Sequence, residues 1–346
     1  MRSSHARALS VCLLVLLLLL FTPPFCFAQG AQGQVRERRV SARGEEVGPG
    51  DIVRIETDLV SVEVTVKDGA GQSVRGLRQD AFRIFEDEVE QPISFFSAHS
   101  TGDGVQCPLD LVFALDVSGS MKPHEMELLR DAAAHFKESL SEHNSRFAVI
   151  SFGMSVKVLQ SFTDDQRKLD KVFNSAIQDE MGLSTHAYDA VDDAVRLLVR
   201  QGRKTSGEQL VKRIVIVISD GFPTGDTVSP RTVIERANAA NVSVYSVTMP
   251  SFSFNYAASH GRPLPTILDV SGLVAQTGGV SVYATDQNYA DAFKSIREEV
   301  LSKYVIAFYP NKEKRRDEQF HKLRIAAPGG LTISQSRQGY AGKGQR

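Results

Sequence analysis

Two short segments without a single polar residue constrain the fold of this chain more than any other feature. They are 111–115 (LVFAL) and 214–218 (IVIVI). A strand that is apolar at every position must be covered on both faces, as in a parallel sheet enclosed by helices. Over 108–302, further strand candidates alternate with segments whose apolar residues have helical spacing. This alternation predicts an α/β fold: a doubly wound, mainly parallel sheet with helices on both faces.

Strand patterns also flank this region. A small β module is expected over 51–100, where β-branched residues partly alternate with polar ones. A segment of roughly 50 residues in strands buries too little surface to be stable by itself. Further strand candidates lie within 303–340. We therefore expect these C-terminal strands to pack with the β module or with the edge of the main sheet.

The amino terminus has the organisation of a secretory signal peptide. Positive charge at its start is followed by the apolar run 11–21, two prolines and the small-x-small pattern Cys26-Phe27-Ala28. We expect 1–28 to be removed on export, and 29–50, rich in Gly, Gln and Arg, to be a disordered linker. The alternative is an uncleaved segment that anchors the chain to a membrane. The expected location is outside the cell, in the periplasm or in the cell envelope.

The charge balance and the absent motifs exclude several classes of function. The 346 residues include 40 Lys and Arg against 41 Asp and Glu. This composition lacks the basic excess of a nucleic-acid-binding protein. The sequence contains no G-x-G-x-x-G or Walker loop for nucleotide phosphates and no G-x-S-x-G turn to present a serine nucleophile. A non-enzymatic protein without a nucleic-acid partner is therefore favoured.

Oxygen-bearing side chains cluster where the two apolar strands end. Asp116 directly follows the first segment, and Asp220 comes two residues after the second. The carboxyl ends of parallel strands share one edge of a doubly wound sheet, where ligands bind. Hydroxyl groups join them from the turn after Asp116 and from the loop before a predicted helix: Ser118, Ser120 and Thr185, with Ser184 as the alternative to Thr185. Such hard oxygen ligands suit Mg²⁺, Mn²⁺ or Ca²⁺ and disfavour Zn²⁺.

With this arrangement, the region 108–302 resembles the von Willebrand factor type A (vWA) domain family. The D-x-S-x-S motif of the family matches Asp116, Ser118 and Ser120, and the later threonine and aspartate of its metal-ion-dependent adhesion site match Thr185 and Asp220. The resemblance implies that the two serines bind the metal directly, whereas the aspartates act wholly or partly through water. An ion with few anionic ligands stays electrophilic, so it can take a carboxylate from a partner protein.

The flanks narrow the resemblance to a bacterial group of secreted vWA-related proteins. The matching residues are Gly76, Leu77, Asp80, Phe82, Phe85, Glu86 and Asp87 before the sheet region, and 304–310 (YVIAFYP) and Gly339-Tyr340 after it. The threonine loop departs from the family, because Leu183 and Ser184 stand where relatives often have glycine.

A long loop on the same edge of the sheet offers side chains for partner binding. The segment 250–265 follows the end of a predicted strand and is long for a connection between a strand and a helix. It carries Phe252, Phe254, Tyr256 and Arg262. Aromatic and arginine side chains are typical interface anchors, so we expect this loop to select the partner.

The leading prediction is an exported, adhesion-type vWA protein. It would use a divalent metal, Mg²⁺ or else Mn²⁺ or Ca²⁺, to capture an Asp or Glu carboxylate of a protein partner. In the alternative, the β flanks mediate contacts within an assembly, and the metal site is structural or vestigial. A third possibility, hydrolysis at a metal between Asp116 and Asp220, lacks a placed general base.

Overall fold

The computed structural model of the chain describes residues 59–98, 107–118, 123–140, 143–175, 185–205, 210–219, 223–249, 265–284 and 289–342. The predicted signal peptide and linker lie outside these residues. The described residues belong to one compact unit, Asp51–Arg346. No helix among them is both long and apolar enough to cross a membrane.

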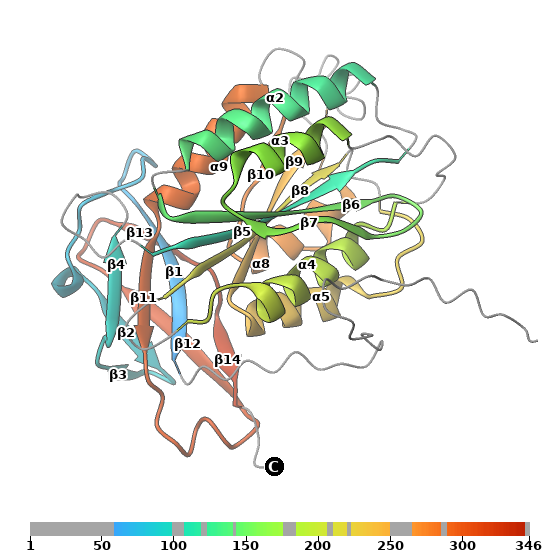
Figure 1. Cartoon of the computed structure of the whole chain (residues 1–346). Helices are drawn as coiled ribbons and strands as arrows, with labels where there is room; N and C mark the ends of the chain where they lie inside the picture. Colours follow the sequence, from blue (N-terminus) through green and yellow to red (C-terminus); the bar gives the residue numbers. More distant parts are fainter. Residues whose placement is uncertain are drawn as a thin grey trace, which may run out of the picture. The chain divides into compact units, whose positions relative to one another are not determined.

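A six-stranded sheet forms the centre of the described structure (Figure 1). Its strand order is β10-β9-β8-β5-β6-β7. Every neighbouring pair is parallel except β6 and β7, which pair antiparallel at one edge. The strands are β5 (Leu109–Asp116), β6 (Ser145–Phe152), β7 (Lys157–Thr163), β8 (Lys212–Ser219), β9 (Val242–Thr248) and β10 (Ser281–Tyr283). This arrangement confirms the predicted fold class.

Helices cover both faces of this sheet (Figure 1). One face carries α2 (Pro123–Ser139), α3 (Gln166–Ser175) and α9 (Tyr289–Ser302). The other carries α4 (Ala187–Gln201), α5 (Pro230–Ala239), α7 (Ile267–Val270) and α8 (Leu273–Gln276). Strand β5 serves both cores, since Phe113 packs on the first side and Val112 on the second. All eight residues of β5 are buried, as expected for a strand that is covered twice.

One predicted helix is divided in two. The sequence suggests a single helix near 266–276, whereas the structure has α7 and α8 with Gly272 between them. Gly272 has a φ of 77°, a left-handed conformation that ends the first helix and that glycine adopts without steric cost. Thr266 and Asp269 form a capping box at the start of α7.

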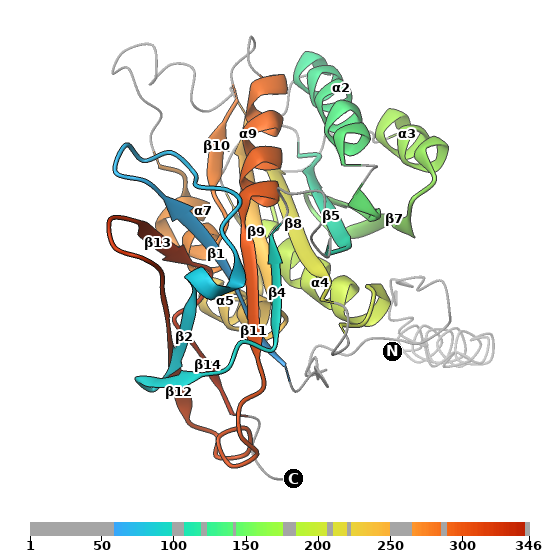
Figure 2. The same ribbon diagram turned by 90° about the vertical axis from the view of Figure 1, so that its left-hand side faces the viewer.

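Strands from the two ends of the chain form two four-stranded antiparallel sheets that share one core (Figure 2), here called the β sandwich. The first has the order β13-β1-β11-β4 and the second β14-β12-β2-β3. The elements are β1 (Val60–Lys67), the 3-10 helix η1 (Gln79–Ala81), β2 (Arg83–Glu86), β3 (Val89–Gln91), β4 (Phe95–Ala98), β11 (Tyr304–Phe308), β12 (Phe320–Ala326), β13 (Thr332–Gln335) and β14 (Gly339–Ala341). Val62, Ile84 and Leu323 lie in the shared core, so each end of the chain covers apolar surface of the other.

A single residue, Lys303, connects α9, which packs on the main sheet, to the β sandwich. It follows the last residue of α9 and precedes the first of β11. Its side chain is buried and its Nζ donates to Tyr245 Oη at 2.8 Å. Carboxylate oxygens of Glu63 and Glu299 lie 3.6 and 3.9 Å away. Burial lowers the pKa of Lys303, but Tyr245 and the two glutamates outweigh it and hold the pKa above its ordinary value.

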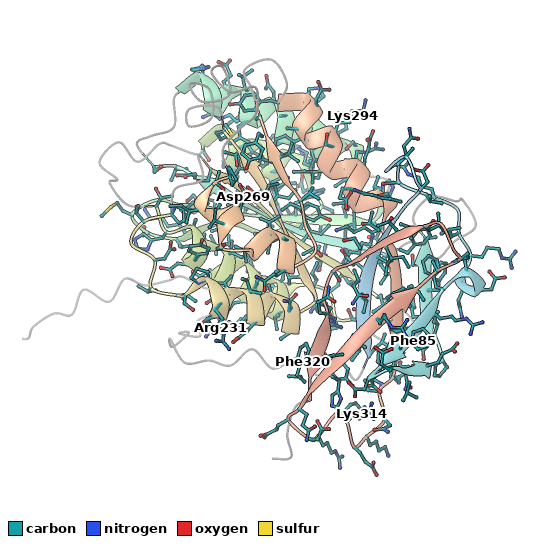
Figure 3. All side chains as sticks on the ribbon, turned by 180° about the vertical axis from the view of Figure 1, so that it is seen from behind. Phe85, Arg231, Asp269, Lys294, Lys314 and Phe320 are labelled. Carbon is teal, nitrogen blue, oxygen red and sulfur yellow. The ribbon has the colours of Figure 1, made fainter. Side chains whose placement is uncertain are left out.

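We predict that Lys303→Met destabilises the chain by about 3 kcal/mol, because it removes the ammonium next to the largely buried Glu63 carboxylate. The matched control is Arg231→Met on α5 (labelled in Figure 3), which breaks an exposed pair with Glu235 and should cost little, because water screens that pair. Urea unfolding of both variants checks the difference. Equal losses would show that the Lys303 contacts do not stabilise the junction.

A buried histidine links two turns of the β sandwich. His321 Nδ1 lies 2.8 Å from Asp87 Oδ2, and Nε2 lies 3.0 Å from Asp317 Oδ1. Lys314 Nζ and the backbone N–H of Lys322 also donate to the Asp87 carboxylate. A carboxylate that accepts these bonds is ionised, so the imidazole nitrogens act as donors. Burial lowers the pKa of His321, but the hydrogen bonds to Asp87 and Asp317 outweigh it and raise the pKa above 6.5.

This contact makes stability depend on pH. A raised pKa in the folded state stabilises fully below the unfolded value of about 6.5, and the contribution is lost as pH rises through the folded value. His321→Gln should therefore cost about 1–3 kcal/mol at pH 6, and the difference from the parent chain should shrink toward pH 9. Urea unfolding at both pH values tests this, with His135→Gln on the exposed side of α2 as control. A difference independent of pH would contradict a charged His321.

Candidate metal centre

Asp116 joins the carboxyl ends of two neighbouring strands. It is the last residue of β5 and is fully buried. Its Oδ2 accepts a hydrogen bond of 2.6 Å from the hydroxyl of Ser219, the last residue of β8. Its Oδ1 accepts from the backbone N–H of Ser118 at 2.9 Å, which shapes the turn after β5. The carboxylate and the Ser118 residue, itself 2% exposed, are thus fixed at the edge where ligands of such sheets bind.

Thr185 comes to the same edge from another loop. Its N–H donates to the Thr224 carbonyl at 3.0 Å, and the Thr224 N–H donates to the Thr185 carbonyl at 2.8 Å. The following N–H, that of His186, donates to the carbonyl of Gly153 at 3.3 Å. Gly153 directly follows the end of β6, whose Phe152 carbonyl accepts from Val117. The Thr185 loop and the turn after β5 therefore meet at the end of β6.

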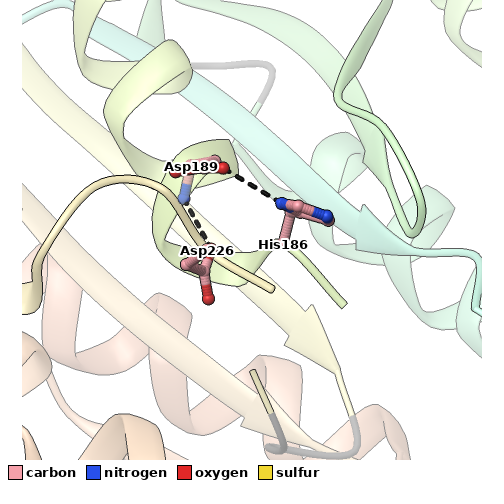
Figure 4. A group of neighbouring side chains, drawn as sticks. All are labelled: His186, Asp189 and Asp226. Atoms are coloured by element: carbon pink, nitrogen blue, oxygen red, sulfur yellow. Dashed lines mark hydrogen bonds and ion pairs between the residues drawn. The ribbon is translucent and has the colours of Figure 1, made fainter. Parts of the chain in front are cut away.

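Two carboxylates and one imidazole form a cluster (Figure 4) that includes His186, the residue after Thr185. One ligand atom from each of His186, Asp189 and Asp226 lies within 4.8 Å of the others. Asp189 accepts from His186 Nδ1 at 3.0 Å, from Val228 N at 2.9 Å and from the N–H and hydroxyl of Thr227. Asp226 Oδ1 accepts from the N–H of Asp189 at 3.0 Å. These bonds fasten the loop 223–229 to the first turn of α4.

The pKa values of the two carboxyl groups in this cluster shift in opposite directions. Burial raises the pKa of Asp189, but the N–H groups of Val228 and Thr227 and the ring of His186 outweigh it, so the pKa lies below its usual range. Burial, with the negative charge of Asp189 nearby, raises the pKa of Asp226. Residues of these types can bind a cation, but the oxygens of Asp189 are already used as acceptors. We interpret the cluster as a clamp that positions Thr185.

The structure describes Asp116, Ser118 and Thr185 of the predicted ligand set. It places Asp116 at the end of β5, and Ser118 and Thr185 on loops that meet at the same edge of the sheet. The remaining predicted site residues lie outside the described residues and stay predictions: Ser120, Asp220, Phe252, Phe254, Tyr256 and Arg262, as well as the alternative ligand Ser184. Sequence reasoning missed Ser219, Thr224 and Asp226. The sequence contained one signal for Ser219, because this hydroxyl residue directly precedes Asp220 at the end of the predicted strand.

The described residues fit a hard divalent cation. A carboxylate from Asp116 and hydroxyls from Ser118 and Thr185 are oxygen donors, which Mg²⁺, Mn²⁺ and Ca²⁺ prefer. Ser118 and Asp116 are almost completely shielded from solvent, so a cation bound between them would be weakly screened.

We predict that Asp189→Asn loosens the clamp, since an amide NH₂ group would face the donors of Thr227 and Val228. The expected loss of stability is about 1–3 kcal/mol in urea unfolding, with faster hydrogen exchange at the Thr185 and Thr224 amides. Asp291→Asn is the control, because Asp291 occupies the first turn of α9 as Asp189 does that of α4, and is exposed. Equal losses of stability in both variants would mean that Asp189 stabilises the chain only through the dipole of α4 and not through its bonds to Thr227 and Val228.

Comparisons with known proteins agree with the resemblance seen in the sequence. Residues 110–261 match the family model of the von Willebrand factor type A domain. Human matrilin-3 is 28% identical over 148 residues, which are 40% of this chain and 29% of that protein. Mouse integrin alpha-X is 24% identical over 162 residues, or 43% of this chain and 13% of that protein. The chain thus spans less than a third of these relatives.

Among solved structures, an aerotolerance-related membrane protein from Bacteroides fragilis aligns with 56% of this chain and 98% of its own, at 15% identity and a TM-score of 0.43. The family match over 110–261 coincides with most of the parallel sheet and with the loops that carry Asp116, Ser118 and Thr185. This chain therefore contains a region, residues 110–261, that matches the von Willebrand factor type A domain family.

Proposed function

We propose that this chain is an exported, non-enzymatic binding protein that captures an acidic side chain of a protein partner through a divalent cation. The observation that carries the proposal is the Asp116 carboxylate, which connects the ends of β5 and β8 beside the buried Ser118. Export rests on the signal-peptide pattern of 1–28.

The proposed ligands are Asp116, Ser118, Ser120, Thr185 and Asp220. The serine and threonine hydroxyls are neutral, so a bound Mg²⁺, Mn²⁺ or Ca²⁺ would keep enough positive charge to attract a further carboxylate. Thr185 would be held in place by the clamp of His186, Asp189 and Asp226. Phe252, Phe254, Tyr256 and Arg262 would contact the partner around the ion.

A second candidate function is assembly through the β sandwich, with a metal site that is only structural or vestigial. Apolar side chains on the sandwich surface favour it. Phe320 is 61% and Val89 59% exposed. Phe320 lies on β12, next to β2 with Phe85 (Figure 3), on the sheet side opposite the shared core. Contact through this face would need no cation.

The first test is thermal unfolding of the purified chain with Mg²⁺ or Mn²⁺ against EDTA. A cation at about 100 times its dissociation constant should stabilise the parent by about 2.7 kcal/mol. Asp116→Ala and Ser118→Ala should abolish this gain. Ser118→Ala should still fold if Asp116→Ala does not, because the hydrogen bond from Ser118 to Asp116 comes from the backbone N–H and is kept.

Glu235→Gln, an exposed carboxylate on α5, is the matched control and should keep the full gain. Stabilisation that persists in Ser118→Ala would place the cation elsewhere. Absence of any gain in the parent would favour the assembly function.

A further inference from the structure

A pocket lies at the opposite edge of the main sheet from the metal centre. It is bordered by the first residues of β8 and β9 and by β1 of the sandwich, and includes Glu63, Lys212, Asn238, Asn241, Ser336 and Arg337. The centre of a water-sized molecule can occupy about 30 Å³ of it, and the space between its walls, open solvent included, is about 440 Å³. The pocket thus sits where the sandwich meets the amino ends of the parallel strands.

Arg337 is a buried cation in this pocket with two unused hydrogen-bond donors. The residue is only 9% exposed, and its Nη1 donates to the Asn238 carbonyl at 3.3 Å. Its Nε and Nη2 have no hydrogen-bond partner, although both atoms are buried. Burial lowers the pKa of Arg337 to about 10, so the guanidinium keeps its charge at neutral pH. A buried charge without an acceptor is costly, which indicates a missing partner.

The two unused nitrogens specify what that partner should be. Nε and Nη2 lie on the same edge of a guanidinium, and this edge binds the two oxygens of one anion. Arg146 shows the arrangement in this chain, since its Nε and Nη2 donate to the two oxygens of Asp110 at 3.1 and 2.8 Å. The edge of Arg337 offers the same pair of donors.

The carboxylate that lines the pocket is already engaged. Glu63 accepts from Ser243 Oγ at 2.9 Å and lies 3.6 Å from Lys303 Nζ. Ser336 Oγ accepts from the Glu63 N–H at 3.0 Å, so its own proton can be donated into the pocket. Lys212 also lines the pocket, and its Nζ donates to the carbonyls of Val300 and Lys303; burial lowers its pKa. The lining beside Arg337 thus combines these donors with the Glu63 carboxylate, which Ser243 and Lys303 already engage.

We propose that this pocket binds a small oxyanion, a phosphate or a carboxylate, through the Nε–Nη2 edge of Arg337. The hydroxyl of Ser336 and the side-chain amide of Asn238 would donate to the remaining oxygens. Both nitrogens are shielded, so binding would require the guanidinium to rotate toward the pocket. A bound anion would connect the sandwich, through Arg337, to the helix end at Asn238. This site is independent of the divalent cation.

The test is thermal unfolding of the full chain in EDTA, titrated with inorganic phosphate or with acetate against chloride at constant ionic strength. A saturable rise in Tm with one or both anions is expected, and the two titrations distinguish phosphate from carboxylate. Arg337→Lys keeps the charge but loses the two-donor edge. It should weaken binding by about tenfold or more.

Arg324→Lys is the matched control, because the Nε and Nη2 of the half-exposed Arg324 already hold Glu88. It should keep the full rise. If Arg337→Lys does not fold, Asn238→Ala replaces it; this leaves the carbonyl bonded to Arg337 intact and should weaken binding several-fold. No rise in the parent chain, or an equal and unsaturable rise in all variants, would overturn the proposal, since the latter is a general salt effect.

Discussion

The burial of β5 on both faces is the constraint on which the rest of this structure depends. The strand contributes to both hydrophobic cores, and it carries a fully buried carboxylate near each end, Asp110 and Asp116. A buried carboxylate is stable only with strong partners. Asp110 receives guanidinium donors from Arg146 and Arg203, at 2.8 Å each. Asp116 receives a serine hydroxyl and a backbone N–H, and it stands among further oxygen groups. The first arrangement neutralises a charge within the protein, and the second is compatible with a bound cation.

The direction of the chain gives the two edges of the sheet opposite electrostatic character. Helices in a doubly wound fold run antiparallel to the strands, so their carboxyl ends gather at the amino edge of the sheet. Cations are favourable at helix carboxyl ends. Lys212 Nζ donates to the carbonyl of Val300 near the end of α9, and Arg213 Nη1 to that of Ala240 at the end of α5. At the other edge, Asp189 stands in the first turn of α4, where an anion is favourable.

The sequence predicted the elements of the main sheet because short apolar segments show which strands and helix faces are buried. A segment such as 214–218 has to be covered twice, and Asp116 has to follow a strand end. These patterns could not predict that β2 pairs with β12. Periodicity shows which face of a strand is apolar, but it does not show which strand is its neighbour. Asp189 was ambiguous for a similar reason. In the sequence it is an ordinary first-turn aspartate, and only the position of Thr227 and Val228 makes it a clamp. Gly272 is a sequence signal for the break between α7 and α8. The helical spacing of the apolar residues continues across it, so the sequence predicts one helix.

The β sandwich has a physical reason to stay with the main sheet. Lys303 continues directly from α9 into β11, and its ammonium is shared among Tyr245 of β9, Glu63 of β1 and Glu299 of α9. Moving the sandwich away would expose apolar residues and separate these charges in one step. Displacement of α9 along its axis would likewise disturb Lys303 and with it the start of β11. The sandwich and the helix are therefore connected through Lys303 and its contacts with Tyr245, Glu63 and Glu299.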